Sequence, residues 1–268
     1  MGRLTIFAKG NLDLRDSLHS LKIGGQFHWN GINEILRGRF PGTLARLRHE
    51  VWTRSDALLE AVGTIPAEIA KRDLPMAPYA AEAQFSTAVF DADCDAIILS
   101  ILPDLTSSLL RHRRDRFLLY PYNSASWAPV DFEWLRREFE VVELLDVETS
   151  MSNLARIVAR LQQKSPAPIL IYNVSSVVPG DSVHCYAGLD DVFSSRIRRF
   201  NLGLIELSRR TGISIVDVDT LVARAGADRL KLDPVHLNAE GCRLVAAEVV
   251  RVLEDLGCLS PSEASRCA

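Results

Sequence analysis

The chain has 268 residues, of which 47% are apolar and 24% are charged, and its 31 Lys and Arg against 34 Asp and Glu give a net charge of -3. These values are ordinary for a soluble globular protein, and a chain of this length can bury a core without disulfides or metals. The near-neutral charge argues against nucleic acid as a partner, because phosphate binding requires a basic excess. No apolar run approaches the roughly 18 residues of a membrane helix.

The remaining composition predicts a cytoplasmic protein without a metal or cofactor. The apolar run at the N-terminus is too short for a signal peptide, and Lys9 interrupts it. The five cysteines are scattered and form no Cys-x-x-Cys pair, which excludes a zinc knuckle or a disulfide framework and indicates a reducing compartment. The histidines show no metal-ligand spacing, and no glycine-rich phosphate loop is present.

Short apolar runs alternate with amphipathic stretches along the chain. Five runs are predicted as strands, at 4–8, 96–102, 116–120, 169–174 and 213–218. Because they are continuously apolar rather than alternating, they are typical of a parallel sheet that is covered on both faces. Three stretches with helical spacing are predicted as helices, at 151–163, 193–211 and 239–256.

The ends of the predicted helices carry capping residues. Ser150 or Ser152 is the expected N-cap of the first, and Gly212 and Gly257 end the other two. Strand–helix alternation predicts a three-layer α/β/α sandwich with a mostly parallel sheet. We expect one α/β domain over 1–258, with an elaboration at about 24–85 that forms a cap or an insertion, and a disordered tail at 259–268.

The segment before the last helix carries the clearest chemical signal. Asp233 precedes His236 by three residues, on a turn that Pro234 stiffens. A carboxylate at this spacing can fix the tautomer of the imidazole and stabilise its protonated form, while the other ring nitrogen acts as a general base. The alternative is a structural turn in which Asp233 caps the backbone and Asn238 caps the helix.

This block, Asp-x-x-His followed by Asn and Gly at the start of a last amphipathic helix, resembles the final block of the SGNH/GDSL hydrolases. The resemblance implies an α/β/α sandwich that hydrolyses or transfers acyl esters through a Ser–His–Asp triad. It places the nucleophile after the first strand and takes oxyanion donors from Gly and Asn of two middle blocks. The order of elements is similar over most of the chain, but only the last block is specific.

The nucleophile block departs from this pattern. Where the family has Gly-Asp-Ser at the strand end, this chain has Gly-Asn-Leu at 10–12 and then Asp-Ser-Leu at 16–18. If residues 9–15 form a loop, Ser17 lies at a helix N-terminus, where N–H groups favour a developing alkoxide, and it is the candidate nucleophile. If residues 10–12 are the true counterpart, leucine replaces the nucleophile and the triad is absent.

The oxyanion blocks are also degenerate. Asn173 ends a predicted strand, and its side-chain amide could donate to an oxyanion, or it could serve a local turn. Gly10 and Asn11 are the other candidates for oxyanion or substrate binding.

Three functions remain open from the sequence. The first is an esterase or acyltransferase that acts on a small ester or acyl group, with Ser17 as nucleophile, His236 as base and Asp233 as its orienting carboxylate. The second is a catalytically degenerate SGNH-fold protein with a ligand-binding or accessory role. The third is a non-acyl acid–base enzyme that uses only Asp233 and His236. The expected partner is a small molecule, and the sequence predicts no oligomeric state.

Overall fold

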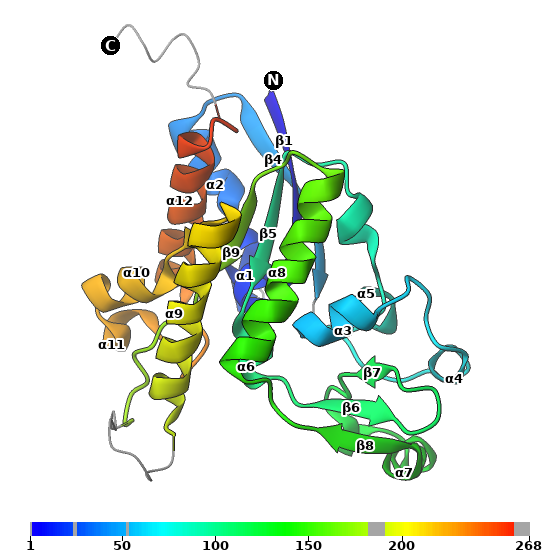
Figure 1. Ribbon diagram of the computed structural model, residues 1–268. Coiled ribbons are helices and arrows are strands. Elements are labelled where there is room, and N and C mark those ends of the chain that lie inside the picture. Colours follow the sequence, from blue (N-terminus) through cyan, green and yellow to red (C-terminus); the bar gives the residue numbers. More distant parts are fainter. Residues whose placement is uncertain (1, 24–25, 52–53, 182–190, 260–268) are drawn as a thin grey trace, which may run out of the picture.

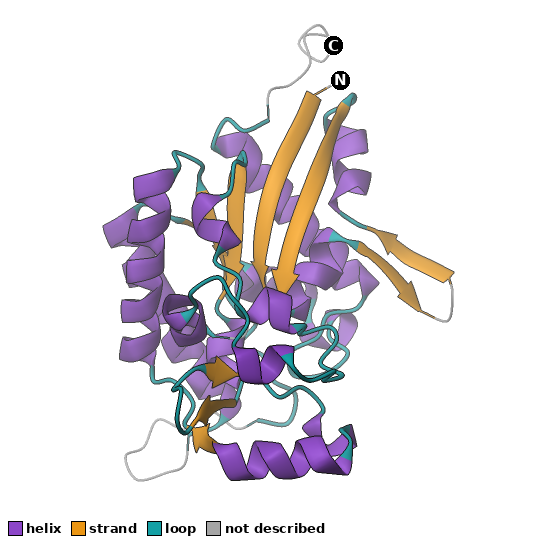
Figure 2. Cartoon of the chain, turned by 90° about the vertical axis from the view of Figure 1, so that its right-hand side faces the viewer, coloured by secondary structure: helices purple, strands orange, loops and turns teal. Residues whose placement is uncertain are grey.

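The computed structural model of the chain describes residues 2–23, 26–51, 54–181 and 191–259. Its centre is a five-stranded sheet with the order β10-β9-β5-β1-β4, in which every neighbouring pair is parallel (Figures 1 and 2). The strands are β1 (Gly2–Gly10), β4 (Thr43–Val51), β5 (Ala96–Ser100), β9 (Ile169–Tyr172) and β10 (Ser214–Val216). The predicted α/β/α class with a parallel sheet is therefore confirmed.

Helices cover both faces of this sheet and form a separate apolar core on each. Along β1, Phe7 belongs to one core while Ile6 and Ala8 belong to the other, as the alternation of side chains along a strand requires. The first core contains the buried faces of α8 (Val147–Lys164) and α9 (Phe193–Thr211). The second contains those of α1 (Leu12–Leu18), α2 (Ile32–Arg39) and α12 (Ala239–Asp255).

Smaller elements surround the central sheet. An antiparallel hairpin and a three-stranded antiparallel sheet comprise β2 (Ser20–Ile23), β3 (Gln26–Asn30), β6 (Leu109–His112), β7 (Leu118–Leu119) and β8 (Phe139–Val142). The short helices are α3 (Ser55–Glu60), α4 (Ala67–Ala70), α5 (Ala81–Gln84), α6 (Leu102–Thr106), α7 (Pro129–Glu138), α10 (Val218–Ala225), α11 (Ala227–Leu230), η1 (Ala88–Asp91) and η2 (Ser124–Ser126). In the part of the chain that the structure describes, no helix combines the length and apolarity needed to cross a bilayer.

One strand of the predicted sheet is wrong and another was missed. The run at 116–120 contributes only β7, which pairs antiparallel with β6 outside the central sheet. The fifth central strand is instead β4, which lies inside the expected elaboration at 24–85 and pairs with β1 along nine residues. Its apolar and charged residues alternate because β4 is an edge strand with partly exposed side chains, and this pattern differs from a buried run.

The long helices follow the prediction more closely. Helix α9 has the predicted bounds and ends at Gly212 with a φ of 73°, which is the left-handed conformation that glycine adopts readily. Helix α8 begins earlier than predicted, because Asp146 rather than a serine accepts the capping hydrogen bond, from the Thr149 N–H. Of the predicted tail, residues 260–268 lie outside the described residues.

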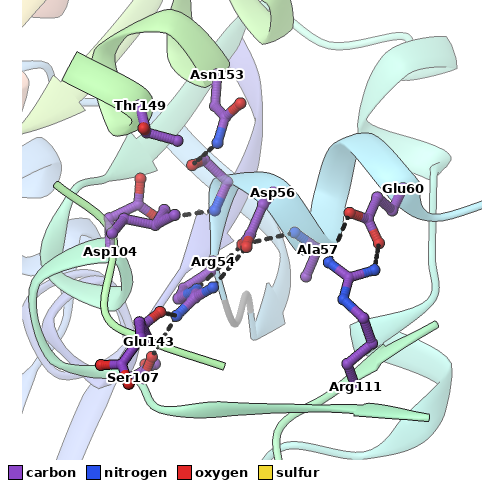
Figure 3. A network of polar contacts seen from close by, with 12 residues as sticks. Arg54, Asp56, Ala57, Glu60, Asp104, Ser107, Arg111, Glu143, Thr149 and Asn153 are labelled. Carbon is purple, nitrogen blue, oxygen red and sulfur yellow. Dashed lines mark hydrogen bonds and ion pairs between the residues drawn. The ribbon is translucent and has the colours of Figure 1, made fainter. Parts of the chain in front are cut away.

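A buried arginine connects the segments that cross the carboxyl edge of the sheet (Figure 3). The Arg54 side chain is fully buried, and its guanidinium binds Asp56 in two hydrogen bonds. It also donates to the carbonyls of Ser107 and Glu143, at 3.3 and 2.8 Å. Arg54 thereby fixes the start of α3 to the segments that flank the small sheet.

Replacing this arginine is expected to destabilise the fold strongly. Arg54→Ala leaves two carbonyls and Asp56 without their donor, so the free energy of unfolding should fall by about 3–5 kcal/mol. Urea unfolding measures the loss, with Arg136→Ala as the matched control. The Arg136–Glu133 ion pair is exposed, and its loss should cost less than about 1 kcal/mol. Equal losses in the two variants would contradict a structural role for Arg54.

Candidate active site

Strand β1 passes into helix α1 without an intervening loop. Asn11 is the N-cap of α1, and its Oδ1 accepts a hydrogen bond from the Leu12 N–H at 2.7 Å. Gly10 packs so closely that a Cβ there would lie 2.4 Å from Cδ1 of Leu14. The expected loop over 9–15 is therefore absent, and Ser17 lies in the last turn of α1 rather than at a helix N-terminus.

The two residues at this junction lie away from the cavity that contains the other candidates. Asn11 is buried, and its Oδ1 also accepts a hydrogen bond from the Tyr79 hydroxyl. Neither Gly10 nor Asn11 lines the cavity described below. Their arrangement fixes the strand–helix junction, and their predicted role in oxyanion or substrate binding stays a prediction.

The pair of Asp233 and His236 has the geometry that its spacing predicts. Oδ2 of Asp233 lies 2.7 Å from Nδ1 of His236, and Oδ1 accepts the backbone N–H groups of Val235 and His236. Partial burial opposes ionisation, but these hydrogen bonds hold the pKa of Asp233 below its usual value. The carboxylate is therefore ionised at neutral pH and directs Nε2 of the imidazole away from itself.

The turn is held in place by helix α12. Asn238 caps this helix by accepting a hydrogen bond from the Gly241 N–H at 3.0 Å, as the sequence predicted. Its amide donates to the Arg229 carbonyl, and its backbone N–H donates to the Leu230 carbonyl. The catalytic and capping interpretations of this segment are thus compatible, since Asp233 caps the turn through Oδ1 and contacts the imidazole through Oδ2, while Asn238 caps the helix.

Ser17 and His236 line one cavity at the carboxyl edge of the sheet. The cavity has a volume of about 30 Å³ and lies between α1, the ends of β9 and the turn before α12. It has room for a small number of waters. Ligands of open parallel sheets bind at this edge, outside the carboxyl ends of the strands.

The hydroxyl of Ser17 is engaged within the protein. It donates to the Asp13 carbonyl at 2.7 Å, as serine often does inside a helix, and lies 3.2 Å from the hydroxyl of Tyr172. The side chain is 2% exposed. No hydrogen bond joins Ser17 to His236 among the described residues, so a reaction requires Ser17 to rotate away from the carbonyl.

Asp13 lies one turn before Ser17 on the same face of α1 and was missed by the sequence analysis. Its Oδ2 accepts a hydrogen bond from the Ser100 hydroxyl at 2.5 Å. Burial raises the pKa of Asp13 to about 6, although the Ser100 hydrogen bond opposes this shift. Ser100 and Tyr172 are paired residues of β5 and β9. Asp13 and Ser17 therefore contact the ends of two neighbouring strands.

Asn173 lines the same cavity, but its side chain already forms hydrogen bonds within the protein. Its amide nitrogen donates to Asp217 at 2.8 Å, and its Oδ1 accepts the Asp219 N–H at 3.1 Å. One amide hydrogen remains for another acceptor. Lys231 is a second cavity residue that the sequence analysis missed, and its ammonium group donates to the Val177 carbonyl.

Nothing in the local sequence distinguishes Asp13 or Lys231 from ordinary surface charges. An acidic residue in the first turn of a helix is common, because it interacts favourably with the helix dipole. The burial of Asp13 depends on β5 and β9, which are distant in sequence. A buried strand that ends in serine, as β5 does at Ser100, was the available but weak signal.

Comparison with known proteins identifies the fold. No family model and no curated protein sequence matches the chain. Among solved structures, a member of the lipolytic G-D-S-L family from Veillonella parvula is 14% identical, with a TM-score of 0.50 over 93% of this chain and 98% of that one. An acetylxylan esterase from Geobacillus stearothermophilus is 10% identical, with a TM-score of 0.52 over 93% and 94%.

A third solved structure matches over a similar share of both chains. A protein from Slackia heliotrinireducens, provisionally assigned as an SGNH hydrolase, is 13% identical, with a TM-score of 0.50 over 94% of this chain and 100% of that one. The chain has a divergent SGNH/GDSL-like fold. These three matches each cover 93–94% of this chain.

Neutralising the buried carboxyl is expected to stabilise this SGNH-like protein at neutral pH. Burial raises the folded-state pKa of Asp13 to about 6, above the ordinary aspartate value of 3.8, so the free energy of unfolding falls as the pH rises through this window. Asp13→Asn has no carboxyl group to ionise. Its free energy of unfolding should therefore exceed that of the unaltered protein by about 2–3 kcal/mol above about pH 7, with no difference below about pH 4. Urea unfolding at both pH values measures the difference.

A matched control separates this effect from other titrating groups. Burial lowers the pKa of His49 to about 4, which gives the opposite pH dependence in every variant. The difference between Asp13→Asn and the unaltered protein cancels that contribution. Asp16→Asn removes a neighbouring carboxylate that is paired with Arg15 and should show no such gain. A gain from Asp13→Asn that does not vary with pH would contradict the buried charge.

Proposed function

We propose that the protein is a hydrolase of small acyl esters in which Ser17 is the nucleophile and His236, oriented by Asp233, is the general base. The observation that carries this proposal is the shared cavity, where a buried serine hydroxyl and an oriented imidazole lie at the carboxyl edge of the sheet. Two elements from opposite ends of the chain supply these groups, and a Ser–His–Asp mechanism needs the serine to come within hydrogen-bond reach of the imidazole.

The reaction follows from the positions of these groups. Ser17 leaves its hydrogen bond to the Asp13 carbonyl and gives its proton to Nε2 of His236 as Oγ attacks the ester carbon. The imidazolium formed is stabilised by the adjacent carboxylate of Asp233. The remaining amide hydrogen of Asn173 and the ammonium of Lys231 are side-chain donors on this cavity that can stabilise the oxyanion.

The second half of the reaction releases the acyl group. His236 returns its proton to the leaving alcohol, and a water that it then deprotonates attacks the acyl-enzyme. An acceptor alcohol in place of water would give acyl transfer. The structural neighbours named as esterases support ester chemistry on this fold, and the function itself rests on the site.

A second candidate is supported by one observation. Helix α1 begins at Leu12 directly after the strand, and the Ser17 proton is held by a carbonyl of its own helix. In this candidate no covalent serine intermediate forms. The pair of Asp233 and His236 either activates water directly in a non-acyl reaction or contributes only to a ligand-binding site.

Labelling of the activated serine separates the two candidates. A fluorophosphonate probe should add one adduct by intact mass, and Ser17→Ala and His236→Ala should abolish it. Ser175→Ala is the matched control, because Ser175 is another buried serine on the same cavity. Labelling that survives in Ser17→Ala but not in Ser175→Ala would move the nucleophile to Ser175. No labelling and no p-nitrophenyl acetate turnover would favour the second candidate.

The orienting carboxylate gives an independent prediction. Asp233→Asn keeps the shape of the turn but cannot stabilise the imidazolium, so kcat for p-nitrophenyl acetate should fall about 10²–10⁴-fold while KM changes little. Thermal unfolding would verify that the fold is retained. A higher KM with an unchanged kcat would indicate that Asp233 has only a structural role in the turn.

A further inference from the structure

A buried phenol contacts the candidate nucleophile. Tyr172 is the last residue of β9, is 1% exposed, and lines the cavity together with Ser17. Its hydroxyl lies 3.2 Å from Oγ of Ser17, and the described residues offer this phenol no other hydrogen-bond partner. Because a buried tyrosine hydroxyl is rarely left without a partner, the contact with Ser17 is the one that satisfies it.

The neighbouring carbonyls decide which of the two hydroxyls is the donor. Oγ of Ser17 lies 2.7 Å from the carbonyl of Asp13 and 3.4 Å from that of Leu14, and a carbonyl can only accept. Ser17 has a single hydroxyl proton, and the short contact with the Asp13 carbonyl takes it. The proton between the two side chains therefore belongs to Tyr172, and Oγ of Ser17 accepts it.

The phenol is held in place and stays protonated. Strand β9 lies between β5 and β10, and Tyr172 is paired with Ser100 on one side and Val216 on the other. Burial raises the pKa of Tyr172 above the ordinary value for tyrosine, so its hydroxyl remains a donor at neutral pH. A donor that is positioned before charge develops needs no reorganisation during the reaction.

The charge on Oγ changes during the proposed reaction. The Ser17 hydroxyl can turn about its Cβ–Oγ bond, which redirects the proton and leaves Oγ beside the phenol. The O–H bond then breaks as the proton passes to Nε2 of His236, Oγ bonds to the ester carbon, and the carbonyl electron pair moves to the carbonyl oxygen. A hydrogen bond to an oxygen that gains negative charge becomes shorter and stronger.

We propose that Tyr172 is a positioning residue for acylation: its hydroxyl donates to Oγ of Ser17 and stabilises the negative charge that develops there as His236 takes the proton. This inference rests on the proposed function, because it concerns the same serine. Tyr172 acts through Ser17 and keeps its own proton throughout. The Asp13 carbonyl, which is the other close partner of Oγ, is an acceptor and cannot stabilise this charge.

Removal of the phenol hydroxyl tests the proposal on the acylation step. Tyr172→Phe keeps the ring, and kcat/KM for p-nitrophenyl acetate should fall about 10–100-fold, together with the rate of fluorophosphonate labelling of Ser17. Tyr122→Phe is the matched control and should retain both rates. Tyr122 packs against Tyr79, makes no side-chain hydrogen bond within the described residues and does not line the cavity. Thermal unfolding would verify that both variants are folded.

The strength of the donor gives a readout that a purely structural role would not change. Tyr172→3-fluorotyrosine keeps nearly the same shape but has a more acidic phenol, which donates a stronger hydrogen bond. Its kcat/KM and labelling rate should therefore rise above those of the unaltered protein, whereas Tyr122→3-fluorotyrosine should leave both unchanged. This variant also decides the question if Tyr172→Phe does not fold.

The outcomes separate failure of this inference from failure of the proposed function. An unchanged kcat/KM in Tyr172→Phe, or no rise in Tyr172→3-fluorotyrosine, would retain the esterase and overturn the role of Tyr172. Absence of both turnover and labelling in the unaltered protein, or labelling of a serine other than Ser17, would overturn the proposed function and this inference together.

Discussion

The direct passage from β1 into α1 is the constraint on which the site depends. Gly10 allows Leu14 to pack against the strand end, and Asn11 directly after it caps the helix. Together they fix the orientation of α1 about its own axis. With the helix fixed in this way, Asp13 and Ser17 lie one turn apart on the cavity face and contact β5 and β9. A loop at this junction would leave both side chains unplaced.

The other half of the site is local in sequence and needs much less of the fold. Asp233 and His236 are connected through side-chain and backbone hydrogen bonds of a single turn, and the N-cap residue of α12 connects this turn to the end of α11. The two halves of the site therefore differ in how much their placement destabilises the folded protein. The turn satisfies its own polar groups, whereas α1 brings a carboxyl into a buried position where its charge is disfavoured.

This difference explains how much could be predicted from the sequence. The Asp233–His236 pair was found because its geometry depends on residues three apart, and helix α9 was found because its apolar period is unbroken. Strand β4 was missed because an edge strand with partly exposed side chains alternates like a surface segment. Asp13 was missed because its environment comes from strands far along the chain, which no local pattern encodes.

The central claim is that Ser17 and His236 act as one catalytic unit across the cavity, and a double-variant cycle on kcat/KM tests it most directly. If the two residues form one unit, Ser17→Ala and His236→Ala should each cause about the same loss, and the double variant should be no slower than either. Losses that multiply in the double variant would contradict the claim, because they would show that the two side chains contribute independently.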